Sequence, residues 1–485
     1  MNTIRTKITS GIFWSILMRW SVKFIGLIST IILARILTPD DFGLVAMATL
    51  VIALIEEFST INVSLLLIRA SGNDIEQSNT AWTIGIVQSF LLAALLVVFA
   101  PFAADYFNDP RVTLVIYILA FIKIAAGFQN IGMVLARKEL NFSLDFKFIV
   151  YRRVSIFLAV VSLALIYQNY WAIVFGTLIG EVVSVWLSYK FHPYRPSVSF
   201  TFAKEYIRFA IPMIPLSIAR LLNNKFDVIV VGGNTGTSQM GIYNVANELG
   251  SVFTKEVILP TARGLFPNFT RLAEDRAQFV RVYLNILSAT FVFSAPVVAG
   301  MWLVADNFVY VVLGQQWMET TEFLKLLILY GAVSSVITIM AEHPLIALKM
   351  EYKANSIMWL RVSVLIICVI YGFKVMGIYG AALGMACSSL INLPLVIFLI
   401  SRLLNIKVLE FIKASVSPIL SAGFMFAIVS FLVQPHLSTG NHYFDLAVST
   451  CSGGVLYLCA LILLWHIRGK PDSIEKILVN KIKRR

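Results

Sequence analysis

The stretch GIFWSILMRWSVKFIGLISTIILARILTPDDFG, residues 11–43, decides the fold class of this 485-residue chain. Its apolar part runs for about 26 residues, which as an α-helix would be roughly 39 Å long, enough to cross a bilayer. Arg19 and Lys23 lie inside it, one helical turn apart on the same face. Charges at membrane depth are costly, so they normally face a protein interior or a water-filled cavity. The stretch therefore predicts a spanning helix that presents two cations to an internal site for an anion.

The composition extends this interpretation to the whole chain. Hydrophobic residues make up 59% of the sequence and charged residues 13%, against about 25% charged in soluble domains. Apolar runs of about 20 residues recur along the chain. We expect an all-α integral membrane protein with fourteen transmembrane helices, at residues 11–37, 42–68, 80–104, 112–136, 148–167, 170–189, 205–232, 239–262, 280–305, 321–348, 355–373, 377–401, 409–433 and 443–467.

The basic residues predict the orientation of these spans. Most of the 39 lysines and arginines fall in the N-terminus, the even-numbered connections and the C-terminal tail. The odd-numbered connections carry only Arg35, Arg111 and Lys374. By the positive-inside rule both termini lie in the cytoplasm. The net charge of +13 is thus a topology signal, no nucleic-acid partner is expected, and we expect the tail KIKRR to contact anionic membrane lipids.

Many charged residues fall within the predicted spans, far more than a passive helical bundle needs. Besides Arg19 and Lys23, the cations are Lys123, Arg152, Arg153, Arg220, Lys225, Lys255, Lys325 and Arg361. The acids are Glu56, Glu57, Glu181, Asp227, Glu248, Glu256 and Glu342.

An internal repeat relates the two halves of the chain. Arg153-Val154-Ser155 recurs as Arg361-Val362-Ser363, and Gly176 matches Gly384 at the same offset of 208 residues. Six spans per copy is an even number, so both copies have the same orientation, and parallel repeats commonly bind substrate at their interface. We expect an N-lobe at 1–200, a C-lobe at 201–405, and an appended helix pair with a basic cytoplasmic tail at 406–485.

The cysteines give no sign of a metal site. Cys368, Cys387, Cys451 and Cys459 all lie in apolar runs without metal-ligand spacing. We expect them to be small buried hydrophobic residues, and we expect neither a metal nor a cofactor.

Thr38-Pro39-Asp40-Asp41 has the pattern of a helix start. Thr38 can cap the helix, Pro39 suits its first position, and the two acids favour its positive end. We favour a structural turn between spans 1 and 2 over a binding role for these acids.

The segment Leu33 to Gly43, LARILTPDDFG, resembles the L-A-R-x-L-T-P-x-D-F-G signature of bacterial polysaccharide transporters. These are lipid-linked oligosaccharide flippases of the MATE-like exporter (MOP) superfamily, including the O-antigen and colanic-acid-type branches. Asp227, the pair Gly232-Gly233 and the triplet Gly241-Ile242-Tyr243 also resemble that family at the start of its second lobe.

The resemblance implies two pseudo-symmetric six-helix lobes around a central cavity that opens alternately to each side. It implies that the substrate is an oligosaccharide repeat unit on undecaprenyl pyrophosphate, which is flipped across the bacterial cytoplasmic (inner) membrane for surface polysaccharide export. The physical interpretation agrees, because cavity cations can replace the lost hydration of a pyrophosphate. Polysaccharide polymerase or export machinery would be the protein partners.

As substrate-binding cavity cations we single out Arg19, Lys23, Lys123, Arg220 and Lys225. A structural pair of Lys225 with Asp227 or Glu248 stays open as an alternative, and these acids would then balance charge. For Arg153 and Arg361, symmetry-related at the starts of their spans, two roles are open: head-group anchoring, and a gate or substrate contact.

Glu56 and Glu57 point about 100° apart on a helix, so they cannot share one narrow face. One of them would neutralise Arg19 or Lys23, and one would carry a coupling H⁺ or Na⁺. A buried carboxylate with a raised pKa suits the proton role.

Two other functions are weighed against the flippase. A cation-coupled multidrug exporter of the same fold would want acids dominating its cavity, whereas span 1 offers only bases. A membrane enzyme would need a sizeable extracytoplasmic loop or a nucleophile and base, which the short connections do not offer. We therefore expect a transporter and no enzyme.

Overall fold

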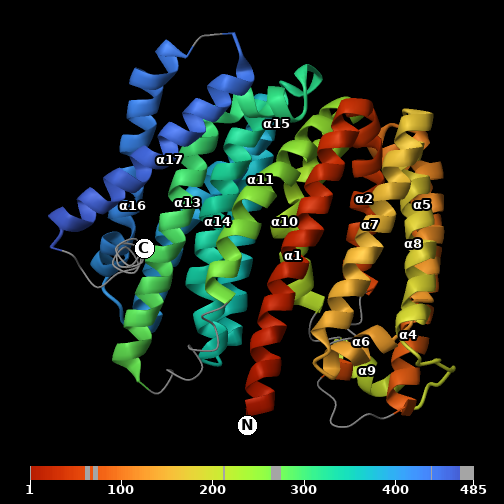
Figure 1. The fold of residues 1–485 in the computed structure, drawn as a ribbon. Coiled ribbons are helices and arrows are strands. Elements are labelled where there is room, and N and C mark those ends of the chain that lie inside the picture. The colour runs from red at the N-terminus through yellow and green to blue at the C-terminus, as the bar shows by residue number, and fades with distance from the viewer. Residues whose placement is uncertain are drawn as a thin grey trace. The chain divides into compact units, whose positions relative to one another are not determined.

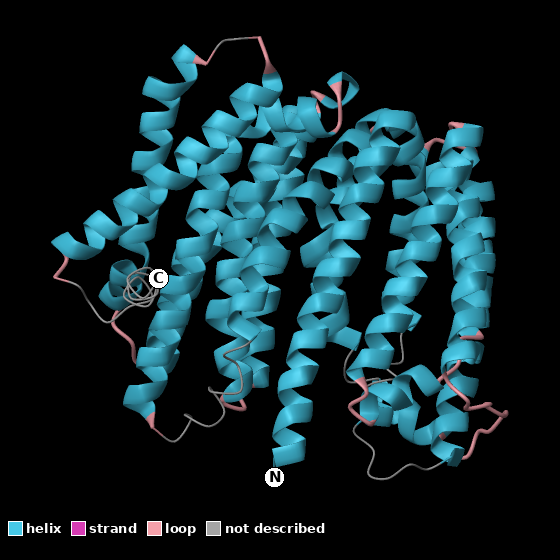
Figure 2. Ribbon diagram, viewed as in Figure 1, coloured by secondary structure: helices cyan, strands magenta, loops and turns pink. Residues whose placement is uncertain are grey.

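The computed structural model describes residues 2–59, 66–68, 75–210, 214–263, 275–437 and 440–469 (Figure 1). Every regular element in these residues is a helix (Figure 2). The principal helices are α1 (Asn2–Ile36), α2 (Pro39–Ser59), α4 (Ile75–Phe107), α5 (Arg111–Gly127), α6 (Gly132–Lys138), α7 (Phe142–Tyr167), α8 (Trp171–Phe191), α9 (Ala203–Ala210), α10 (Ile214–Asn234), α11 (Thr237–Arg263), α13 (Arg276–Val312), α14 (Thr320–Ala347), α15 (Glu351–Leu404), α16 (Val408–Ile428) and α17 (His442–Ile467).

The predicted all-α membrane class is confirmed by these helices. Nine of the described helices are long and apolar enough to cross a membrane, or ten if the bent pair α5–α6 forms one span. The number of fourteen spans stays a prediction. The tail KIKRR lies outside the described residues.

Helix α15 is a hairpin of two arms, although its 54 residues appear as one element. The backbone leaves the helical conformation at Met376 and at Gly377, where φ is +59°. Gly372 and Gly380 then face each other so closely that a Cβ on either would meet the other's carbonyl oxygen. The predicted break between residues 373 and 377 is therefore a tight turn between two helices. Gly377 supplies the positive φ that this turn requires.

The hairpin of α7 and α8 repeats this packing at the offset of 208 residues. A Cβ on Gly176 would lie 2.5 Å from the Cα of Val160. At the equivalent positions, Gly384 packs against the backbone of Cys368 with the same lack of space. The same small residue thus allows the same close helix crossing in both hairpins, which agrees with an internal duplication. The arrangement of two six-helix lobes stays a prediction.

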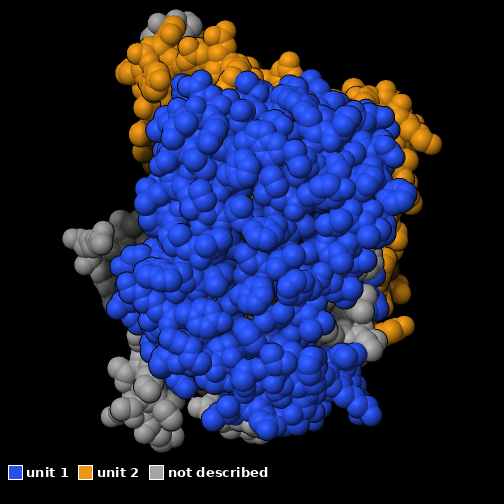
Figure 3. Space-filling model, turned by 90° about the vertical axis from the view of Figure 1, so that its right-hand side faces the viewer, with its two compact units in different colours: residues 1–241 blue, residues 242–485 orange. Residues whose placement is uncertain are grey.

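The chain divides into two compact units, Met1–Gly241 and Ile242–Arg485, which Figure 3 shows in different colours. In the first unit α4 packs along α5, α7 packs along both α8 and α1, and α10 packs on α2. In the second unit α13 packs against α14, α16 and α17, and α14 packs against α15.

Helix α14 is the most enclosed of the candidate spans. Within the second unit 78% of its apolar window is buried, whereas the figure for α7 in the first unit is 11%. The Tyr283 hydroxyl on α13 donates to the Met340 carbonyl of α14 at 3.1 Å, inside an apolar cluster that includes Phe279 and Phe411. Helix α7 instead presents much of its apolar surface outward, as a lipid-facing helix does.

The span predicted at 112–136 is broken. Helix α5 ends at Gly127, and α6 begins at Gly132 at an angle of 58°. Asn130 explains the break, because its side chain accepts from the Gly132 amide at 2.9 Å and its own amide donates to the Ser188 hydroxyl at 2.9 Å. An asparagine that bonds local backbone groups offers them an alternative to the helix.

The cysteines correct the expectation of burial. Cys387, Cys451 and Cys459 are exposed, and Cys368 is half-buried. Their helices are apolar on the outside too, because the surrounding medium of a membrane protein is lipid. A small apolar residue on such a face contacts lipid, so it avoids water without being buried in the protein.

The turn before α2 is structural, as the sequence indicates. One carboxylate oxygen of Asp41 accepts from the Thr38 amide at 3.0 Å and from its hydroxyl at 2.7 Å. The other accepts from the Tyr170 amide before α8 at 2.8 Å. Asp41 thereby caps its own helix and holds the adjacent hairpin at its α7–α8 turn.

Asp40 joins the same turn to two further elements. Its carboxylate accepts from Arg111 at 2.9 Å and from the Thr237 hydroxyl at the start of α11. At this point Gly43 and Gly241 bring two helix starts together, since a Cβ on Gly43 would meet the Thr237 carbonyl oxygen. Residues 33–43 and Gly241, the first residue of the second motif, thus have a structural explanation within the first unit.

We predict that Gly176→Ala lowers the stability of the protein by about 1–3 kcal/mol, because the added methyl group meets backbone and forces the hairpin apart. Thermal unfolding of the purified protein in detergent measures this. Gly85→Ala is the matched control, because a Cβ there has nothing within 4 Å and should leave stability unchanged or slightly higher. Equal stability of the Gly176→Ala variant and wild type would contradict the packing described.

We predict that Asp40, which precedes the predicted span 2, stabilises the folded protein to an extent that depends on pH. Partial burial raises the pKa of its carboxyl, but hydrogen bonds from Arg111 and Thr237 and the charge of Arg111 outweigh this and lower the pKa below 3.8. A lowered pKa in the folded state adds stability above the unfolded pKa, and this is lost as the pH falls through the folded value.

Asp40→Asn should therefore be less stable than wild type at neutral pH, and the difference should shrink below about pH 4. Thermal unfolding across a pH series measures the difference, with Asp105→Asn at an exposed position of α4 as the control. A difference that persists unchanged to pH 3 would be incompatible with this role.

Candidate functional site

Helices α1 and α7 lie side by side within the first unit and run parallel (Figure 1). Near their N-terminal ends, Gly11 of α1 packs against the ring of Phe142, and the rings of Trp14 and Phe146 lie 5.0 Å apart. These contacts fix the register that brings residues further along the two helices together.

Further along this contact, Arg153 of α7 reaches α1 at Gly26. Its Nη2 would lie 2.8 Å from a Cβ at position 26, so the guanidinium occupies the space that a side chain there would fill. Glycine at this position is what allows a bulky cationic group to lie against the backbone of α1.

Arg153 thereby joins the two cations of the opening stretch. Positions 19, 23 and 26 lie within an arc of about 60° around α1 and along about 10 Å of its length. Arg19, Lys23 and Arg153 are all half-buried. We call these three side chains the α1 cation cluster. A phosphate group would find on this face both the point charge of a lysine and the planar donors of arginine.

Arg152, the neighbour of Arg153, has a different role. It pairs with Glu181 of α8 at 2.9 Å, and the Glu181 carboxylate also accepts from Gln129 at 2.7 Å. The Glu181 side chain is only 4% exposed. Because successive helix residues point about 100° apart, one arginine serves this buried ion pair while the next faces α1.

Lys123, whose role as a cavity cation stays a prediction, forms an ion pair. Its Nζ is 2.8 Å from a carboxylate oxygen of Glu56, so the pair links α5 to α2. Glu57, the next residue of α2, is half-buried. From the sequence, Glu56 or Glu57 was expected to neutralise Arg19 or Lys23, whereas Glu56 pairs with Lys123.

The charged residues of α10 differ in burial. Arg220 is exposed, Lys225 is half-buried and Asp227 is fully buried in the first unit. Glu248 is exposed on the part of α11 that belongs to the second unit. The side chains of Lys255 and Glu256 lie outside the described residues.

Arg361, the repeat equivalent of Arg153, is buried inside the second unit with 3% of its surface exposed. Its Nη2 donates to the Ser334 hydroxyl at 3.0 Å, and its carbonyl accepts from Asn392 at 3.3 Å. The equivalent arginines thus meet different surroundings, since Arg153 faces α1 whereas Arg361 faces α14. Sequence reasoning gave both the same role because it compared positions and not neighbours.

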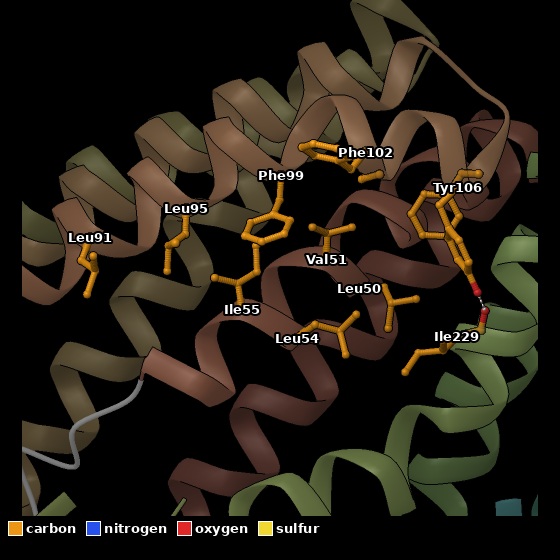
Figure 4. A pocket seen from close by; sticks show the side chains of 12 residues that line it. Leu50, Val51, Leu54, Ile55, Leu91, Leu95, Phe99, Phe102, Tyr106 and Ile229 are labelled. Atoms are coloured by element: carbon orange, nitrogen blue, oxygen red, sulfur yellow. Dashed lines mark hydrogen bonds between the residues drawn. The ribbon is translucent and has the colours of Figure 1, made fainter. Parts of the chain in front are cut away.

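An apolar pocket of about 580 Å³ lies between α2, α4 and α10 in the first unit. Figure 4 shows Leu54 and Ile55 from α2 facing Leu95 and Phe99 of α4. At one end the Tyr106 hydroxyl donates to the Ile229 carbonyl at 3.0 Å (Figure 4). The pocket has the chemistry of a site for hydrocarbon, and no motif in the sequence pointed to it because its lining is ordinary apolar residues.

Known proteins resemble this chain both in sequence and in fold. A family model described as polysaccharide biosynthesis protein matches residues 32–322. The lipopolysaccharide biosynthesis protein WzxC of Escherichia coli is 24% identical over 82% of both chains. The succinoglycan biosynthesis transport protein ExoT of Rhizobium meliloti is 23% identical over 95% of this chain and 94% of its own.

Solved structures share the fold. The lipid II flippase MurJ in an inward closed conformation has a TM-score of 0.77 at 13% identity, covering 94% of this chain and 99% of its own. A mutant of the Vibrio cholerae MATE transporter VcmN has a TM-score of 0.56 at 14% identity, covering 84% and 99%.

ExoT is described as a transport protein and MurJ as a flippase, in agreement with the expectation of a transporter. The family model covers more than half of the chain, and it includes the whole LARILTPDDFG segment from which the resemblance was inferred. The chain belongs to the polysaccharide biosynthesis protein family, and its fold is that of the flippases and exporters of the MOP superfamily.

Proposed function

We propose that this protein flips an undecaprenyl-pyrophosphate-linked oligosaccharide across the bacterial cytoplasmic membrane, for export of a surface polysaccharide. The α1 cation cluster is the observation that carries the proposal. It gathers Arg19, Lys23 and Arg153 on one face of a spanning helix, where an anionic group crossing the membrane needs compensation. The descriptions of WzxC and ExoT as polysaccharide biosynthesis and transport proteins support the substrate class.

The energetics of a pyrophosphate favour a polar route. Moving an isolated ion into an apolar medium costs tens of kcal/mol. A cation at 4 Å returns about 4 kcal/mol at an effective dielectric constant near 20. Three cations alone cannot offset such a cost, so the cluster would work inside a hydrated cavity. A hydrated cavity between two lobes that opens alternately to each side would keep the head group in polar surroundings throughout.

The hydrocarbon tail has different needs. In our proposal it stays among apolar surfaces while the head group crosses, and the pocket between α2, α4 and α10 offers such a surface beside the route. The tyrosine hydroxyl at its end is occupied by the Ile229 carbonyl, so the lining that remains suits an isoprenoid chain.

The Glu56–Lys123 pair is our candidate for ion coupling. A carboxylate held by a lysine at 2.8 Å would release that lysine when H⁺ or Na⁺ neutralises it. Glu57, Asp227 and Glu248 are further acids for charge balance, and Arg220 and Lys225 are further cations for the pyrophosphate. Arg361, buried against Ser334, would act as a gate through its helix contact.

The topology that goes with this function has fourteen spans and both termini in the cytoplasm. A polysaccharide polymerase or export complex would receive the flipped unit on the outer side. A cation-coupled drug exporter of the same fold is the competing function, and the tests below separate the two.

We predict that Arg19→Ala and Lys23→Ala each lower the flipping rate about 10- to 100-fold, the effect of losing one charge-assisted hydrogen bond. The measurement is flipping of a lipid-linked oligosaccharide in proteoliposomes. Lys349→Ala removes an exposed cation of the second unit and is the control. Normal rates in both α1 variants would contradict the anion site. Drug resistance that tracks expression, without glycan flipping, would favour the exporter.

We predict that Gly26→Ala disturbs the cluster without unfolding the protein. The new methyl group meets the end of a flexible arginine side chain, so the guanidinium moves while α1 and α7 stay packed. We expect a loss of about tenfold in flipping, since small misplacements of a binding group are costly, with unchanged thermal stability.

A double-mutant cycle tests the cause. In an Arg153→Ala background the same glycine substitution should have little further effect, because the group that it displaces is gone. Additive losses would show that Gly26 acts through something other than Arg153.

A further inference from the structure

The segment between α8 and α10, residues 192–210, is tied along the beginning of α4 within the first unit. We call it the inter-repeat strap. The amide of Ser197 donates to the Asn79 side chain at 3.0 Å, and the amide of Ser199 donates to the Thr83 hydroxyl at 3.0 Å. The Tyr194 hydroxyl donates to Asn79 at 2.6 Å. These bonds hold residues 192–200, the extended part of the strap that precedes α9, in one place.

On the strap, polar groups face the protein and apolar side chains face outward, which is the reverse of a water-soluble surface. Side chains alternate in an extended segment, and here the serines bond to α4 while Val198 and Phe200 face outward. Val198 is 70% exposed and Phe200 61% exposed. Ile207 on α9 is also exposed, whereas Tyr206 beside it is fully buried. Apolar side chains gathered on the outside of a polar attachment mark a surface that something apolar covers.

The position of the strap indicates what covers it. Helix α4 has 33 residues, so it is about 50 Å long and exceeds a hydrocarbon core of about 30 Å. The strap bonds to its first turns, where the helix leaves the core. Beside it Trp186 of α8 is 59% exposed, and Lys190 lies 4.7 Å over its ring. A tryptophan and a lysine at this level are typical of the membrane interface.

The strap is also cationic. Arg195, Lys204 and Arg208 are exposed, and Glu205 is the acid among them. Arg195 is held in place, since its Nη1 donates to the carbonyls of His192 and Tyr194, each at 2.9 Å. Cations at the edge of an apolar face complement phosphate groups above acyl chains.

We propose that the inter-repeat strap is a docking surface for anionic phospholipid, which it binds through Arg195, Lys204 and Arg208 while Val198, Phe200 and Ile207 enter the interface. The strap anchors the connection between the two repeats to the membrane. This role is independent of the substrate that the protein carries.

The test uses the purified full-length protein and phosphatidylglycerol. Phosphatidylglycerol should raise the Tm of wild type more than phosphatidylcholine does, and R195Q/K204Q/R208Q should lose at least about half of that difference. The charge-preserving R195K/K204R/R208K should keep it. K349Q/K353Q/R402Q removes three exposed cations of the second unit and should also keep it. A full lipid effect in the strap variant, or an equal loss in the control, would overturn the proposal.

A second measurement addresses the apolar side chains without removing any charge. A fluorescent label on Val198→Cys, in a background with the four native cysteines replaced by alanine, should be shielded from aqueous iodide in phosphatidylglycerol vesicles. The same label on Glu139→Cys, at an exposed polar position, gives the aqueous reference. Equal quenching at the two positions would also overturn the proposal.

Discussion

The cost of a charge in an apolar surrounding is the constraint on which the rest of this structure depends. Glu181 satisfies it by accepting from Arg152 and Gln129. Glu56 satisfies it by pairing with Lys123 across two helices. A glycine on α1 admits Arg153 to the face that carries Arg19 and Lys23. An anion beside this face would interact favourably with each of the three cations.

The helical plan could be read from the sequence because the length and hydropathy of a span are local properties. The predicted positions of the helices agree with the structure over most of the chain. One difference, at the break between α5 and α6, arises where a side chain competes with the helix for backbone bonds. Asn130 ends α5 through its bond to the Gly132 amide, and such competition depends on Ser188, 58 residues further along the chain. Hydropathy alone cannot register a partner at that distance.

The site was predictable only in part, for a similar reason. Arg19 and Lys23 are four residues apart on one helix, so their common face follows from helix geometry. The addition of Arg153 depends on the parallel packing of α1 on α7, which no local pattern contains. One signal was present in the sequence: Gly26 falls on the same face as the two cations, and a glycine inside a spanning helix often marks a close approach. The pairing of Lys123 with Glu56 of α2 likewise joins two helices, so no local pattern indicates it.

The repeat shows which features of a duplicated hairpin are fixed by the backbone and which are free to change. Gly176 and Gly384 occupy equivalent positions, and each packs on the backbone of the preceding arm. A larger residue at either position would separate the helices, so packing constrains both copies alike. The charges are not so constrained. Arg152 and Glu181 of the first hairpin stand where the second has Leu360 and Ser389. An ion pair can be replaced by neutral residues if both partners change together, because no uncompensated charge is left behind. The two copies can therefore share one helical framework while only the first places a cation against α1.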